Sequence, residues 1–160
     1  MEDIEQNFDR IVRENYEQIF RTIMSIVLNK DDAQDLTQET FLRAYIKRHT
    51  FRGESEITTW LTRIALNVTI NFLRRRDKAA EHQKQFEIPA PPENHSEEKL
   101  YVWQALEKLS PDERLVLVMY YFHGFSQAEI AQRLGINLGA VKMRIKRAKE
   151  KFARFYGEEK

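Results

Sequence analysis

The sequence has no cysteine, few glycines, few prolines and no long apolar run. Without cysteine, disulfides, thiolate nucleophiles and cysteine-based zinc sites are excluded, and a reducing compartment is permitted. No apolar stretch approaches the ~18 residues of a membrane span, and the first residues (MEDIEQ) are acidic, so we expect neither a transmembrane helix nor a secretory signal. Five glycines and four prolines among 160 residues predict an all-α chain.

The charge of the chain alternates in blocks, although its net value is only +1. Residues 1–44 sum to −5, residues 45–80 to +5, residues 81–113 to −5 and residues 114–160 to +6. Two basic blocks separated by acidic ones suggest two separate contacts with a polyanion, but the solvated faces of ordinary helices would give the same counts. The choice between these interpretations depends on what the basic blocks contain.

Three of the four prolines fall in residues 77–98 (DKAAEHQKQFEIPAPPENHSEE), which hold few apolar residues. Proline cannot continue a helix, and it biases the preceding residue toward extended backbone. We therefore assign residues 78–98 to a flexible linker. The chain then divides into residues 1–77 and residues 99–160, two domains near the lower size limit for an independent core.

Two capping boxes and a glycine predict a helix-turn-helix in the second domain. The tetrapeptides Ser110-Pro111-Asp112-Glu113 and Ser126-Gln127-Ala128-Glu129 each place a serine cap three residues before a glutamate, as a helix start requires. Gly135 supplies the left-handed end of the second, short helix, and Asn137 is in position to cap a third.

The third helix combines an apolar stripe with a strongly basic surface. The stripe comprises Val141, Ile145, Ala148 and Phe152, spaced as one helical face. The remaining positions hold one acidic residue and seven basic residues, which are Lys142, Arg144, Lys146, Arg147, Lys149, Lys151 and Arg154. A short capped helix, a tight turn and a long basic helix can place a recognition helix in the major groove of DNA. We favour this interpretation over a surface helix whose lysines only provide solubility.

Residues 32–47 have helical periodicity and two contrasting faces. The expected core stripe comprises Ala33, Leu36, Phe41 and Ala44. The opposite stripe comprises Asp35, Glu39, Leu42 and Ile46, with Gln38 beside it. Acids at the positive end of a helix explain Asp35 but not the apolar Leu42 and Ile46, so we interpret this stripe as a partner surface. Nothing fixes a ligand geometry for a metal at the acids of this segment.

Residues 58–76 form another expected helix, with an apolar stripe and a polar one. The apolar stripe comprises Leu61, Ala65, Val68 and Phe72, and the polar stripe comprises Trp60, Asn67, Asn71 and Arg74, with Arg63 at its edge. Indole, amide and guanidinium groups suit the exposed nucleobases and the phosphates of a single strand. Trp60 alone is better explained as a core residue, but Asn67, Asn71 and the run of arginines at 74–76 favour single-stranded nucleic acid. The preceding loop, Phe51-Arg52-Gly53-Glu54-Ser55, is suited to receive an extruded base.

In this order, the segments resemble those of the extracytoplasmic-function sigma factors, the two-domain minimal sigma subunits of bacterial RNA polymerase. Residues 31–45 (DDAQDLTQETFLRAY) resemble family regions 2.1–2.2, residues 51–76 regions 2.3–2.4, and residues 109–152 region 4. The resemblance implies two small helical domains joined by a linker, the second a helix-turn-helix. It also implies a non-enzymatic subunit that binds core RNA polymerase, recognises the −35 and −10 promoter elements and helps to melt the promoter.

The resemblance further implies a set of contact residues. The polymerase-binding residues are Asp35, Gln38, Glu39 and Leu42. The −10 DNA-binding residues are Phe51, Arg52, Gly53, Glu54, Ser55, Trp60, Arg63, Asn67, Asn71 and Arg74. The −35 DNA-binding residues are Lys142, Met143, Lys146 and Arg147. Where the family commonly has Gly-Thr-Val-Lys-Ser-Arg, residues 139–144 read Gly-Ala-Val-Lys-Met-Arg. Two hydroxyl groups near the DNA are therefore missing, so we expect an unusual −35 preference.

We expect no cofactor, no bound metal and no catalytic residues. The sequence holds no phosphate-binding loop, catalytic triad or metal-ligand cluster, and its four histidines are scattered. The expected partners are core RNA polymerase, promoter DNA (duplex at −35 and single-stranded at −10) and an anti-sigma factor, because the chain has no obvious sensor of its own. We expect a cytoplasmic protein, monomeric when free, without membrane insertion.

Two other classes of function remain open on the sequence alone. A stand-alone helix-turn-helix regulator would bind duplex DNA as a dimer, but the stripe of Trp60, Asn67 and Asn71 is not needed for duplex readout. A helical adaptor without a nucleic-acid role would bind its partner independently of salt, and the charge blocks argue against it.

Overall fold

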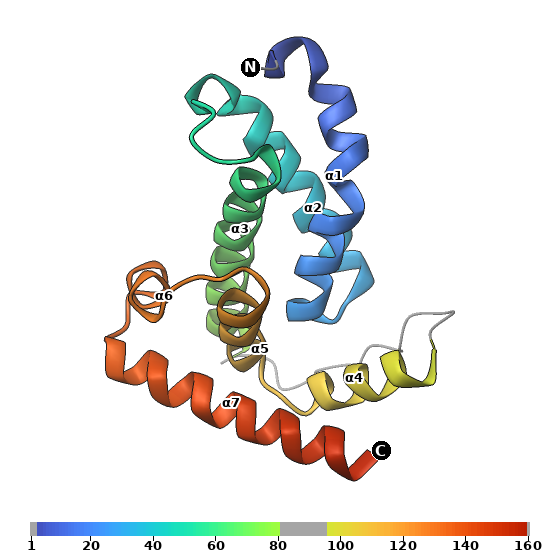
Figure 1. Cartoon of the computed structure of the whole chain (residues 1–160), viewed down its shortest axis with the longest axis vertical. Coiled ribbons are helices and arrows are strands. Elements are labelled where there is room, and N and C mark those ends of the chain that lie inside the picture. Colours follow the sequence, from blue (N-terminus) through green and yellow to red (C-terminus); the bar gives the residue numbers. More distant parts are fainter. Residues whose placement is uncertain (1–2, 81–95, 160) are drawn as a thin grey trace. The chain divides into compact units, whose positions relative to one another are not determined.

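The computed structural model describes residues 3–80 and 96–159, and these are helical without a strand, which confirms the all-α prediction (Figure 1). The chain forms two compact units, residues 1–83 and residues 84–160. Of the segment that we assigned to a linker, residues 81–95 lie outside the described residues. The ends of that segment are helical, because one helix runs on to Ala80 and the next begins at Glu97.

The first unit comprises α1 (Ile4–Val27), α2 (Lys30–Ile46), the 3-10 turn η1 (Arg48–Thr50) and α3 (Ile57–Ala80). Each of the three long helices packs against the other two. The connection from α1 to α2 is two residues long: Leu28 ends α1 in the left-handed conformation (φ 51°), and the Asn29 side chain caps α2 by accepting from the Asp32 N–H at 2.9 Å. Helix α1 was not predicted from the sequence.

The predicted core stripe of α2 is confirmed, since Ala33, Leu36, Phe41 and Ala44 are all buried. The prediction was too narrow, because Thr37 and Thr40 are fully buried beside them. Their hydroxyls donate to carbonyl oxygens one turn earlier in the helix, at 2.6 and 2.7 Å. A threonine whose hydroxyl is satisfied in this way can enter a core, and its polar character in the sequence hides this.

The apolar stripe of α3 is likewise wider than the sequence pattern indicated. Leu61, Ala65 and Val68 are buried as predicted and Phe72 is half-buried, but further apolar residues of α3 are buried as well. These additional residues are Ile64, Leu66, Ile70 and Leu73. The reason is tertiary: α3 packs against both α1 and α2, so a single narrow stripe cannot cover its contacts.

The second unit comprises α4 (Glu97–Glu107), α5 (Pro111–Leu117), the π-helical turn η2 (Val118–Phe122), α6 (Gln127–Leu134) and α7 (Leu138–Glu159). Helix α7 packs against α4, α5 and α6. Along α7, the predicted stripe is confirmed by the burial of Val141, Ile145 and Ala148, with Phe152 half-buried.

The predicted helix boundaries of this unit are confirmed by their hydrogen bonds. The capping box at α5 is complete, since Ser110 Oγ accepts from Glu113 N and Glu113 Oε2 accepts from Ser110 N, at 3.2 and 3.0 Å. At α6, the Ser126 hydroxyl accepts from Glu129 N at 3.0 Å. Gly135 ends α6 in the left-handed conformation (φ 67°), and Asn137 Oδ1 accepts from Ala140 N at 2.7 Å at the start of α7. The helix-turn-helix is therefore α6, the turn and α7.

Arg114 has a structural role that no local sequence pattern indicates. It is almost fully buried in α5, and its guanidinium donates to the carbonyl oxygens of Leu106 and Leu109 at 3.1 and 2.5 Å. These carbonyls belong to the end of α4 and the connection that follows, where helical hydrogen bonds run out. A buried charge in α5 therefore closes the end of α4.

Candidate nucleic-acid and partner interfaces

The outward face of α2 combines carboxylate, amide and apolar groups. Asp35 and Gln38 are exposed, and Leu42 and Ile46 expose 60% and 59% of their surface. Glu39 is half-buried, and its Oε1 accepts two hydrogen bonds from the Arg43 guanidinium at 3.1 and 2.8 Å. The predicted stripe thus lies on one surface, but its glutamate is held by its own helix.

Tyr45 extends this surface and was not predicted to belong to it. It exposes 46% of its surface, its ring meets the Phe8 ring edge-on at 5.2 Å, and the Arg48 guanidinium lies 4.1 Å above it. Arg48 also pairs with Glu5 at 3.4 Å. The first turns of α1 therefore support the end of α2. The signal was present in the sequence, because Tyr45 follows Leu42 at the i+3 spacing of neighbours on one helix face.

The start of α2 is acidic, and one of its carboxyls has a perturbed pKa. Burial raises the pKa of Asp32, the neighbouring Asp35 and Asp31 raise it further, and the Arg76 charge lowers it in part. Arg76, at the far end of α3, therefore lies near these acids. In residues 3–80 and 96–159, no group of three histidine, aspartate or glutamate side chains is arranged to hold a metal ion.

The loop before α3 is closed by an aromatic contact. The rings of Phe51 and Trp60 lie 5.3 Å apart at 53°, and both residues are half-buried. Trp60 is therefore not simply a core residue, and part of its indole faces solvent. In the loop that follows Phe51, the side chains of Arg52 and Glu54 and the intervening Gly53 are exposed. Gly53 has a positive φ of 72°, which the tight turn requires.

The polar stripe of α3 lies on the solvent side of the helix. Arg63, Asn67, Asn71 and Arg74 are all exposed, one after another along the helix from the partly exposed Trp60. The run of three arginines that follows is divided by the fold. Arg74 and Arg75 are exposed, whereas Arg76 is half-buried near the acids of α2. Two of the three arginine side chains are thus exposed, and the third lies near α2.

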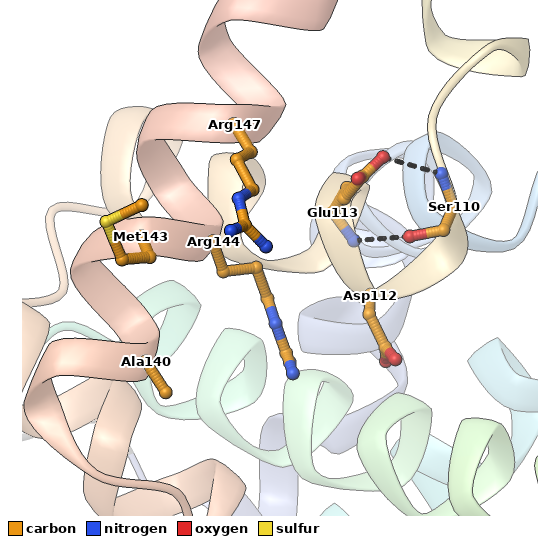
Figure 2. A pocket seen from close by; sticks show the side chains of 7 residues that line it. All are labelled: Ser110, Asp112, Glu113, Ala140, Met143, Arg144 and Arg147. Atoms are coloured by element: carbon orange, nitrogen blue, oxygen red, sulfur yellow. Dashed lines mark hydrogen bonds between the residues drawn. The ribbon is translucent and has the colours of Figure 1, made fainter.

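The recognition-helix candidates lie on the exposed side of α7. Lys142, Met143, Lys146 and Arg147 are all exposed, with Met143 exposing 46% of its surface. A groove of about 380 Å³ lies between α7 and the start of α5 (Figure 2). Arg144 and Arg147 extend into it from α7, and Asp112 and Glu113 lie on the opposite wall. Guanidinium groups on one side of the groove thus face carboxylates on the other.

One of the seven basic residues of α7, Lys151, bonds to α5 and so stabilises the second unit. Lys151 Nζ donates to Glu113 Oε1 at 2.8 Å, while the other oxygen of that carboxylate accepts from the Ser110 N–H. Burial of Glu113 raises its pKa, but the hydrogen bonds from Lys151 and Ser110 and the charges of Lys151 and Arg114 outweigh it, so the pKa is lowered. From the sequence, Lys151 was counted among the basic residues of the predicted recognition helix. Its contact with α5 is tertiary, and no local sequence pattern reveals it.

Comparison with known proteins assigns both units. The sequence profile described as Sigma-70 region 2 matches residues 11–79, and the one described as Sigma-70, region 4 matches residues 99–152. The RNA polymerase sigma-H factor of Pseudomonas aeruginosa is 34% identical, over 89% of this chain and 82% of that protein. The ECF RNA polymerase sigma-E factor of Salmonella typhimurium is 32% identical, over 84% and 79%. The ECF RNA polymerase sigma factor SigE of Mycolicibacterium smegmatis is 31% identical over 90% of this chain, which spans 59% of that relative's length.

Solved structures share the fold. The sigma factor RpoE from Bartonella quintana, in complex with the anti-sigma factor NepR, superposes with a TM-score of 0.68 over 94% of this chain and 96% of that chain, at 24% identity. CnrH, in complex with the cytosolic domain of CnrY, gives a TM-score of 0.56 over 98% and 91%, also at 24% identity.

The matched regions, their order and the helix-turn-helix define a class: the chain belongs to the sigma-70 family of RNA polymerase sigma factors, in the group of extracytoplasmic-function sigma factors. Its function is to recognise promoter DNA and to start transcription with RNA polymerase. Members of this family are not catalytic enzymes. Among the described helices, none has the length and apolar character needed to cross a membrane.

Proposed function

We propose that the two units divide promoter recognition between them. The first unit binds core RNA polymerase and the melted −10 strand, the second binds the −35 duplex, and residues 78–98 connect them. The main support is that the two matched regions belong to separate compact units, and that each unit exposes a surface of the chemistry its target requires. The protein acts through binding energy and is not itself an enzyme.

The polymerase-binding surface comprises Asp35, Gln38, Glu39 and Leu42 on α2. Its support is the unusual mixture of exposed groups, in which a large apolar side chain stands one turn from carboxylates. Such a surface fits a protein partner that presents lysine or arginine side chains beside an apolar ridge.

The −10 surface comprises the loop residues Phe51, Arg52, Gly53, Glu54 and Ser55 and the α3 residues Trp60, Arg63, Asn67, Asn71 and Arg74. A partly exposed indole stacks on a base, the amides reach base edges, and the arginines hold phosphates. The exposed turn at Gly53 and the neighbouring Phe51 and Trp60 rings would receive a base that leaves the stack.

The −35 surface comprises Lys142, Met143, Lys146 and Arg147 on α7. The two lysines and Arg147 hold phosphates and guanine edges, and the exposed Met143 offers apolar contact to a thymine methyl. Because Ala140 and Met143 carry no hydroxyl, readout at these positions relies on shape and apolar contact.

The free protein is a cytoplasmic monomer that an anti-sigma factor holds inactive by covering its polymerase-binding and DNA-binding surfaces. Two solved structures that share the fold are complexes, one of RpoE with the anti-sigma factor NepR and one of CnrH with the cytosolic domain of CnrY.

The division of labour is tested with the purified chain, core polymerase and run-off transcription from genomic fragments, which also yields the promoter sequence. Asn67→Ala should impair promoter opening and leave polymerase binding intact, and Gln18→Ala, at an exposed position of α1, is its control.

Lys146→Glu should abolish −35-dependent binding, and Lys108→Glu, at an exposed position of the same unit, is its control. Equal loss of opening and polymerase binding in Asn67→Ala, or unchanged promoter occupancy in Lys146→Glu, would refute the assignment. No co-elution with polymerase, together with duplex binding by the chain alone, would favour a stand-alone regulator.

A further inference from the structure

A buried amide interrupts the apolar face of α1. Asn15 lies one turn after Ile11 and one turn before Ile19, and it exposes only 5% of its surface. Its Nδ2 donates to the Ile11 carbonyl oxygen at 2.8 Å, and its Oδ1 accepts from the Thr58 hydroxyl at 2.7 Å. The amide is thus satisfied on both sides, and one of its two bonds crosses from α1 to α3.

Thr58, which is half-buried, differs from the buried threonines of α3 in where its hydroxyl donates. The hydroxyls of Thr62 and Thr69 donate to carbonyl oxygens of their own helix, both at 2.8 Å. The Thr58 hydroxyl donates to Asn15, which lies 43 residues earlier in the chain. The first turn of α3 is therefore joined to α1 by a directional bond, in addition to apolar packing.

The bond lies beside the −10 surface. Thr58 is the second residue of α3 and stands two residues before Trp60, whose ring packs on Phe51 at the start of the loop. In the chain between Phe51 and Trp60, the loop turns at Gly53, and its tip is exposed. The direction of the indole, and through it the position of the loop, thus depends on how the first turn of α3 is held.

We propose that Asn15 and Thr58 are positioning residues for capture of the −10 strand. Apolar side chains tolerate small rotations and shifts of one helix against another, whereas a hydrogen bond between two helices sets both a distance and a direction. The Asn15–Thr58 bond fixes the rotation of the first turn of α3 against α1, and so presents Trp60 and the loop in the orientation that an extruded base requires. This inference rests on the −10 role proposed above for Trp60 and the loop.

The test compares two hydroxyl deletions in the full chain bound to core polymerase. Thr58→Val removes the bond to α1, Thr58→Ser keeps a hydroxyl there, and the matched control Thr69→Val deletes a buried hydroxyl that bonds only within α3. The probe is a single-stranded non-template −10 oligonucleotide from a promoter mapped by run-off transcription. We expect Thr58→Val to weaken its binding by on the order of fivefold, with Thr58→Ser and Thr69→Val close to the unchanged protein. Polymerase affinity and −35 duplex binding should stay unchanged in all three.

Asn67→Ala, measured in parallel, separates the two ways in which this inference can fail. If Asn67→Ala loses oligonucleotide binding while Thr58→Val retains it, the positioning role is wrong and the −10 surface stands. If neither variant loses binding, the −10 surface itself is wrong, and the positioning role falls with it. Equal loss in Thr58→Val and Thr69→Val would show a general effect of destabilising α3 and would also overturn the inference. Asn15→Leu added to Thr58→Val should weaken binding no further, because both remove the same bond.

Discussion

Replacing Lys151 by methionine removes a single contact between α5 and α7 while keeping most of the apolar stem of the side chain. In the native unit, Lys151 Nζ donates to Glu113 Oε1 at 2.8 Å, and Glu113 Oε2 accepts from the Ser110 N–H at 3.0 Å. The side chains of Lys151 and Glu113 are 44% and 15% exposed, so the ion pair lies at the edge of the unit rather than in its interior.

These exposures set the expected energies. A partly exposed ion pair contributes about 0.5–1 kcal/mol to the free energy of unfolding, which is the expected cost of Lys151→Met. Glu113→Ala also removes one bond of the capping box, so it should cost about 1.5–2 kcal/mol. The double variant should be no less stable than Glu113→Ala alone, because the pair is lost in either case. A double-mutant cycle should therefore give a coupling energy of about 0.5–1 kcal/mol.

The measurement is urea unfolding followed by tryptophan fluorescence. The chain has two tryptophans, one in each unit, so a Trp60→Phe background leaves the buried Trp103 as the reporter of the second unit. Lys149→Met, at an exposed position of the same helix, is the matched control and should change stability little. A coupling energy of zero, or equal losses in Lys151→Met and Lys149→Met, would refute the view that this pair joins α5 to α7.

Two further predictions concern the same unit. Because the pKa of Glu113 is lowered in the fold, its contribution to the free energy of unfolding is complete above its ordinary value of 4.5 and is lost as the pH falls through the lower folded value. Glu113→Gln should therefore reduce the loss of stability of the second unit in acid, and an unchanged acid dependence would contradict this. Gly135→Ala forces a side chain into the left-handed conformation (φ 67°) and should cost about 1 kcal/mol, whereas Gly157→Ala, which meets no atom within 4 Å, should be neutral or stabilising. Equal effects of the two alanines in urea unfolding would count against the cap.

The helix boundaries of the second unit were predictable because each is determined within a few residues. A serine three residues before a glutamate caps a helix through bonds that span one turn, and Gly135 adopts a positive φ that other residues avoid. The predicted caps at Ser110, Ser126 and Asn137 are therefore found in the structure. The burial of Leu61, Val68 and Val141 followed from periodicity for the same local reason.

The candidate site was predictable only in part. Exposure of the proposed contact residues on α2, α3 and α7 follows from which face of each helix is apolar, and periodicity shows this. Periodicity does not show whether a charged side chain on a polar face bonds to another helix, because that partner lies far away in the sequence. Arg76 near the acids of α2 and Lys151 bonded to Glu113 both belong to this second group.

The all-α class, the caps of the helix-turn-helix and the membership in the sigma-70 family could all be predicted from the amino-acid sequence. Each depends on residues close together in the chain or on motifs in a fixed order. Which polar residues stabilise the fold, in contrast, depends on how the helices pack. Asn15 and Arg114 are buried because groups on other helices or connections complete their hydrogen bonds. The physical reason is that a polar side chain can be buried only where a partner meets it, and the position of that partner is a property of the packed helices.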